Sequence, residues 1–110
     1  MENKKINIIS STSKLEGTVE FSEYTRFEGY ITGKVIGKPG SEIILGENAV
    51  VEGEINGDTV IIDGFVRGNI SASTKVVVSE TGRVIGHINS PSVAIKFGAH
   101  FDGKCATQPL

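Results

Sequence analysis

The sequence predicts an all-β fold, a single-domain triangular parallel β-helix (a β-solenoid) of about six coils. Three observations lead to this prediction. A short phrase centred on a glycine recurs about every 17 residues along the chain. Apolar residues stand at fixed even offsets from that glycine, and polar residues fill most of the odd ones. The composition, with 14 glycines and no tryptophan, suits strands and turns better than helices.

The repeat is defined by six glycines whose intervals are 16, 20, 15, 18 and 17 residues: Gly17, Gly33, Gly53, Gly68, Gly86 and Gly103. Every position two residues before these glycines is apolar: Leu15, Ile31, Val51, Val66, Val84 and Phe101. The same holds two residues after them: Val19, Val35, Ile55, Ile70, Ile88 and Cys105. Alternation with period two predicts strands with these residues pointing inward.

A second apolar pair completes most repeats: Ile43 and Leu45, Val60 and Ile62, Val76 and Val78, Val93 and Ile95. Small residues four positions before the glycines allow the chain to turn at corners, and the extra residues of GKPGSE, 37–42, are expected to loop out. A unit this short has no core of its own. Stacked coils with three sides of about six residues bury continuous apolar ladders, although the spacing does not fix the handedness.

The 110 residues fit one domain, for which we expect a β-helix over 13–106, a flexible N-terminal tail over 1–12 and a C-terminal tail over 107–110. A net charge of −2 gives no reason to expect nucleic acid, and no phosphate-binding loop supports nucleotide binding. The single cysteine excludes an internal disulfide. No signal peptide or membrane span is recognisable, so a soluble cytoplasmic protein is predicted.

The phrases FEGYITGKV, IDGFVRGNI and RVIGHI resemble those of the bactofilins, small bacterial cytoskeletal proteins, and the resemblance covers about residues 13–106. It implies a right-handed β-helix and end-to-end assembly into non-polar filaments without nucleotide. It also implies frequent association with the inner membrane face, and scaffold roles in cell shape or in localising cell-wall enzymes.

A β-helix without caps has two ends with unpaired backbone groups and an apolar cross-section, which favours an open chain of subunits. We expect the polymerisation interface to involve Phe101 with Phe97 at the C-terminal end. The first coil offers Leu15, Val19 and Phe21 at the other end. The alternative is that these residues belong to the core or surface of a capped monomer.

Two further surfaces are candidates for contacts. The segment Lys4, Lys5, Ile6, Ile8 and Ile9 could touch a membrane, or it could be a disordered tail or an extra edge strand. A lateral apolar ridge is predicted for Tyr30, Val50 and Phe65, which stand three residues before aligned glycines. This ridge could bind a partner or a neighbouring filament, or it could be a ladder partly covered by the GKPGSE loop.

An enzyme is not expected, and neither are catalytic residues, cofactors or metals. His87 and His100 fall at outward offsets without an acidic partner in the pattern, which favours surface histidines. Cys105 falls at an inward offset and is expected to be a small buried hydrophobe. The alternative functions are a non-polymerising β-helix binding module and, third, a hexapeptide-repeat acyltransferase.

Overall fold

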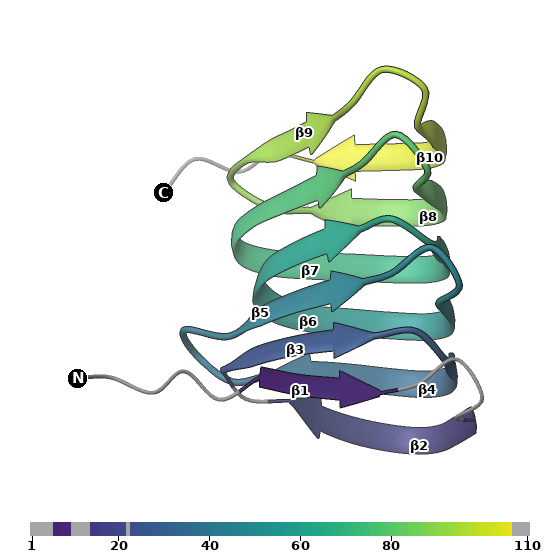
Figure 1. Cartoon of the computed structure of the whole chain (residues 1–110). Helices are drawn as coiled ribbons and strands as arrows, with labels where there is room; N and C mark the ends of the chain where they lie inside the picture. The colour runs from purple at the N-terminus through teal and green to yellow at the C-terminus, as the bar shows by residue number, and fades with distance from the viewer. Residues whose placement is uncertain (1–5, 10–13, 22, 107–110) are drawn as a thin grey trace.

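The computed structural model describes residues 6–9, 14–21 and 23–106, and these residues form one ten-stranded sheet that winds into a solenoid (Figure 1). The strands are β1 (Ile6–Ile9), β2 (Lys14–Phe21), β3 (Tyr24–Phe27), β4 (Tyr30–Gly37), β5 (Glu42–Leu45), β6 (Val50–Ile62), β7 (Phe65–Val78), β8 (Arg83–Asn89), β9 (Val93–Ile95) and β10 (His100–Ala106). Every pairing in the sheet is parallel, as the β-helix prediction requires.

One side of the solenoid, which we call the glycine face, is built from β2, β4, the first half of β6, the first half of β7, β8 and β10. The six predicted glycines pair with one another in unbroken succession along this face, from Gly17 to Gly103. The frame defined by the glycine phrase is therefore the register of the sheet, and the predicted ladders are confirmed.

A second face is built from β1, β3, β5, the second half of β6, the second half of β7 and β9. Strands β6 and β7 continue around the corner between the two faces, and Figure 1 shows both bending there. One register position passes through Asn7, Thr25, Ile43, Val60, Val76 and Val93, so the chain completes five full turns and part of another. The prediction of about six coils is thus slightly high.

The core consists of the inward ladder positions of the middle layers. Val51 and Ile55 in β6 are fully buried, as are Val60 and Ile62 on the second face. Removing each such side chain from water contributes roughly 1.5–3 kcal/mol to folding, so the stacked aliphatic residues supply most of the driving force. Burial declines in the end layers, where Leu15, Val19 and Phe101 pack against the core but remain partly exposed.

The N-terminal boundary differs from the prediction of a flexible tail over 1–12. Residues Ile6–Ile9 form strand β1, paired in parallel with β3, which is the extra edge strand considered as an alternative. The edge of β3 presents backbone N–H and C=O groups that the preceding segment can pair. Residues 1–5, 10–13, 22 and 107–110, which include both predicted domain boundaries, lie outside the described residues.

The glycine column is required by the close approach of neighbouring layers. Gly68 has φ +143°, and a Cβ at this position would overlap the carbonyl oxygen of Gly53 in the layer beneath. Gly17 also has a positive φ of +98°, but a Cβ there would meet nothing within 4 Å. Backbone strain thus applies at both positions, and steric overlap applies only at Gly68.

We expect Gly68→Ala to lower the free energy of unfolding by about 2–6 kcal/mol, since a strained φ costs about 1–3 kcal/mol and overpacking about 1–3 kcal/mol more. Gly17→Ala is the matched control and should lose only the strain component. Urea denaturation followed by circular dichroism measures both. Equal losses in the two variants would contradict the role assigned to layer stacking.

Candidate assembly surfaces

The C-terminal end of the solenoid is formed by β9 and β10, each paired with one strand only. On β10, Phe101 is in register with buried Val84, and Cys105 is in register with buried Ile88. Yet Phe101 is only partly buried and Cys105 is exposed. Ile95 on β9, in register with buried Val78, is 44% exposed.

These residues occupy core positions of a layer that no further described layer covers. Val93, Ile95, Phe101 and Cys105 together form what we call the C-terminal end face. The expectation that Cys105 is buried is therefore wrong, because burial at an inward position requires a layer on both sides. The apolar period of two predicts that a side chain points inward. It does not predict whether another layer covers the coil that carries this side chain.

Phe97 has a different environment from Phe101. It lies in the turn between β9 and β10 and is 99% exposed. The turn at this corner recurs after β5 and β7. In each of the three turns a hydrogen bond closes the loop, and the N–H of Ala49, Gly82 or Ala99 donates to the carbonyl three residues earlier. By this alignment, Phe97 stands where lower layers carry Glu47 and Glu80. It is an aromatic side chain at an outer corner, and it is not part of the packed ladder.

The N-terminal end is formed by β1 and β2, each of which also pairs with one strand only. Leu15 and Val19 on β2 occupy inward positions, are partly buried and pack against the core. Phe21 is only 6% exposed, with its ring centroid 6.3 Å from that of Phe27. Phe21 is thus a core residue, and its expected place in an exposed interface is corrected.

The segment predicted to touch a membrane is divided by the structure. Lys4 and Lys5 lie outside the described residues, whereas Ile6, Ile8 and Ile9 belong to β1 and are held in the sheet by pairing with β3. The described part of the chain contains no helix long and apolar enough to cross a membrane.

The predicted lateral ridge lies along the start of the strands of the glycine face. Tyr30, Val50 and Phe65 stack in register and are all half-buried. The GKPGSE loop follows the opposite end of β4, where the Gly40 N–H donates to the Asp58 carboxylate, so the loop does not cover the ridge. The ridge therefore remains accessible.

Polar contacts fix the lower end of the ridge. The Tyr30 hydroxyl donates to Oε1 of Glu52 at 2.6 Å, and Nζ of Lys14 lies 5.7 Å from the centroid of the Tyr30 ring. The hydrogen bond to Glu52 raises the pKa of the Tyr30 phenol above its ordinary value, because the neutral phenol is the form that donates.

A hollow of about 630 Å³ opens at the corner that follows the glycine face. The connection at Asn56–Asp58 is shorter than the connections in the layers on either side, and the sheet register shifts between Gly57 and Thr59. Pro39 and Pro91 stand among the residues that line the hollow. Unequal connection lengths, visible in the glycine intervals, therefore produce this depression.

The second face also bears an outward apolar stripe that the sequence prediction does not include. Ile44, Ile61 and Val77 stand in register as the penultimate residues of β5, β6 and β7, between inward residues. The signal was available, because runs of three apolar residues such as Ile43–Leu45 fill an outward position as well as two inward ones. The inward ladders alone do not predict this stripe.

Comparisons with known proteins agree with this architecture. The family model described as "Bactofilin: Polymer-forming cytoskeletal" matches residues 7–106. The chain is 34% identical over 96 residues to Bactofilin BacO of Myxococcus xanthus (strain DK1622), covering 87% of this chain and 75% of that protein. It is 30% identical over 93 residues to Bactofilin BacP of the same organism, covering 84% of this chain and 36% of BacP.

A solved structure is similar over almost its whole length. It is the cryo-EM reconstruction of Thermus thermophilus bactofilin double helical filaments, with a TM-score of 0.80 and 25% sequence identity. The match covers 93% of this chain and 99% of the Thermus thermophilus chain. The parallel solenoid is therefore the fold of a protein that forms filaments.

We expect Tyr30 to ionise above the ordinary phenol pKa of about 10. The protonated phenol stabilises the folded state. This contribution is fully present below the pKa that Tyr30 has in the unfolded chain, and it is lost as the pH rises through the higher pKa that Tyr30 has in the folded chain. Absorbance at 295 nm in a Tyr24→Phe background would follow Tyr30 alone. Adding Glu52→Gln removes the carboxylate and should lower the midpoint pH of the Tyr30 titration. An unchanged midpoint would show that the hydrogen bond to Glu52 is not what raises the pKa.

Proposed function

The chain belongs to the bactofilin family of polymer-forming cytoskeletal proteins, and from this we propose that it is a scaffold whose subunits assemble end to end into filaments. The observation that carries the proposal is the C-terminal end face, where Ile95, Phe101 and Cys105 occupy core positions without a covering layer. Another subunit placed on this end would continue the ladders and pair the open edges of β9 and β10.

The contributions of the individual residues follow from their placement. Phe101 provides the central apolar contact of the C-terminal end, because it reaches both the core and the open surface. Phe97, at the outer corner of the same layer, lies where it could contact the rim of an adjoining subunit. Leu15 and Val19 provide the corresponding contacts at the N-terminal end. Phe21 supports this end from within the core.

Assembly of this kind uses no bound nucleotide, because the driving force is burial of apolar ladder ends and pairing of strand edges. The filaments are non-polar in our proposal, with C-terminal ends meeting C-terminal ends and N-terminal ends meeting N-terminal ends. Each contact is then isologous, so the same surface meets itself across a twofold axis.

The cellular role proposed for the filament is a cytoplasmic, non-enzymatic scaffold for cell shape or for the localisation of cell-wall and membrane proteins. The ridge of Tyr30, Val50 and Phe65 offers a lateral surface for such a partner. Contact with the inner membrane face would involve Lys4 and Lys5, repeated along the polymer so that weak individual contacts add. The double helical filaments of Thermus thermophilus bactofilin support lateral association in this family.

A non-polymerising β-helix binding module is the second candidate function. The hollow of about 630 Å³ at the corner near Asn56 is the observation that favours it, since a depression between layers could hold a partner segment. The acyltransferase alternative receives no such support, because His87 and His100 are both exposed surface residues.

We expect Phe101→Arg to abolish filaments while leaving the chain folded, because two buried arginines would meet at every C-terminal contact. Ile85→Arg is the matched control, since Ile85 is an exposed apolar residue (41%) on the side of the solenoid. Negative-stain electron microscopy and sedimentation compare the two variants, and circular dichroism verifies the fold. Filaments from folded Phe101→Arg would refute the C-terminal assignment.

The natural Cys105 reports on filament polarity. In a non-polar filament, two Cys105 thiols lie within each C-terminal contact, and a bis-maleimide that spans one end face should convert most chains into covalent dimers. In a polar filament the thiols stand about one subunit apart, roughly 25–30 Å for six layers at ~4.8 Å each, beyond the reagent. Cys105→Ser and Phe101→Arg are the negative controls. Filaments that yield no dimers would overturn the non-polar arrangement without overturning polymerisation.

A further inference from the structure

The second face carries an apolar stripe that points away from the core. Ile61 and Val77 are half-buried near the ends of β6 and β7, and Ile44 beneath them is 9% exposed. Ala94 on β9 extends the stripe by one layer, and Arg26 on β3 lies at its other end. Because ladder pairing holds the strands in register, this stripe continues from layer to layer along the solenoid.

Charges beside the stripe are arranged asymmetrically along the solenoid. Glu42, Thr59 and Lys75 occupy one register position in three successive layers, immediately before the inward ladder residue of each strand. The column therefore runs from an acid through a neutral residue to a base. Among the described residues, the ion pair that is formed joins Arg26 and Glu28, and Glu42 and Lys75 take no part in it.

This arrangement matches its own copy when the copy is inverted. Consider a twofold axis that lies in the face and runs along β6. It places Glu42 opposite Lys75 of a second copy, and Lys75 opposite Glu42 of that copy. The same axis places Ile44 opposite Val77 and brings Ile61 against its own counterpart. Two charge pairs then flank a continuous apolar contact.

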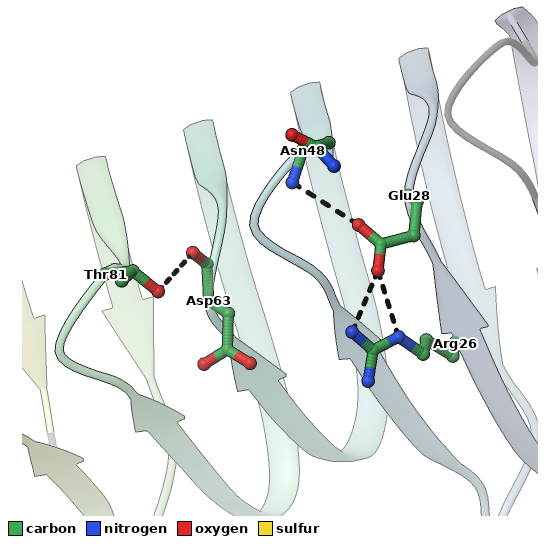
Figure 2. Close-up of polar contacts among 5 residues, drawn as sticks. All are labelled: Arg26, Glu28, Asn48, Asp63 and Thr81. Carbon is green, nitrogen blue, oxygen red and sulfur yellow. Dashed lines mark hydrogen bonds and ion pairs between the residues drawn. The ribbon is translucent and has the colours of Figure 1, made fainter.

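A parallel arrangement of two copies fits less well. A twofold axis along the solenoid brings each residue of the stripe against its own counterpart, so the guanidinium of Arg26 would meet another Arg26. In the inverted arrangement, Arg26 faces Ala94 instead. Figure 2 shows that the Arg26 guanidinium is turned toward Glu28, whose carboxylate also accepts a hydrogen bond from the Asn48 N–H (3.3 Å). The positive charge of Arg26 at this end of the stripe is therefore already neutralised by Glu28.

We propose that the second face binds the second face of another copy of this chain in antiparallel orientation, through Ile44, Ile61 and Val77 and the pairs of Glu42 with Lys75. The proposal deepens the proposed function, on which it rests, because it states how neighbouring filaments associate. In a non-polar filament successive subunits alternate in direction, so each one can face an inverted subunit in the filament beside it.

The area of the second face determines under which conditions two copies remain paired through it. Four layers at ~4.8 Å by four residues at ~3.3 Å give roughly 250 Å² per copy, or about 500 Å² in total. Stable complexes bury about 1,200–2,000 Å², so two isolated subunits should not remain associated. Along two filaments the same contact repeats with every subunit, and the contributions add. Lateral pairing thus depends on end-to-end assembly.

The decisive experiment exchanges the two charges. Glu42→Lys and Lys75→Glu, each alone, place like charges opposite each other twice per contact, so the fraction of paired filaments in electron micrographs should fall roughly tenfold or more. The double variant restores complementary charges and should restore pairing. Pelleting should stay unchanged throughout, because the ends are untouched. Phe65→Glu, on the ridge of the other face, is the matched control and should leave pairing intact.

Paired filaments in both single variants would overturn the proposal, and so would a folded double variant that stays unpaired. Loss of pairing in Phe65→Glu alone would assign the lateral contact to the ridge instead. A second test places Ile61→Cys in a Cys105→Ser background, where oxidation should form disulfide dimers across the axis. If no filaments form, the proposed function fails, and the inference is tested separately. Because a disulfide traps even short-lived encounters of isolated subunits, dimers of the Ile61→Cys variant at high protein concentration support the inference, and their absence overturns it.

Discussion

The stacking of glycine on glycine along one face constrains the rest of the molecule. Each layer approaches the next so closely at this column that a Cβ at Gly33, Gly53, Gly68, Gly86 or Gly103 would overlap the backbone beneath. A slip by one residue would remove the glycine from its place and turn every inward side chain outward. The column therefore sets the register, and the register decides which valines and isoleucines form the core.

The proposed end-to-end assembly uses the same ladders. Val84 and Ile88 are buried because β10 covers them, whereas no described layer covers Phe101 and Cys105 at the same register positions one layer further. The residues exposed at the C-terminal end are thus of the same apolar kind as the residues of the core. A solenoid held together by repeated similar contacts leaves an incomplete contact at each described end, which another subunit completes with the same forces in the proposed filament.

The sides of the solenoid differ although the repeat is uniform. The glycine face bears the ridge at Tyr30, where the hydrogen bond to Glu52 and the nearby Lys14 order the surface. The second face bears the stripe centred on Ile61. At its corner, the Thr81 hydroxyl donates to the carbonyl of Asp63 in the layer beneath at 2.8 Å (Figure 2). In the proposed filament, these distinct sides offer different lateral contacts in different directions.

The sequence by itself determined the repeat, the inward ladders and the parallel stacking, because an apolar period of two around a fixed glycine permits few other arrangements. It also indicated the two ends and the ridge. Only the tertiary structure decided that Ile6–Ile9 adds a strand, that Phe21 is buried, and that Cys105 and Phe97 are exposed. Periodicity gives the direction of a side chain, whereas burial depends on whether another layer or corner covers it.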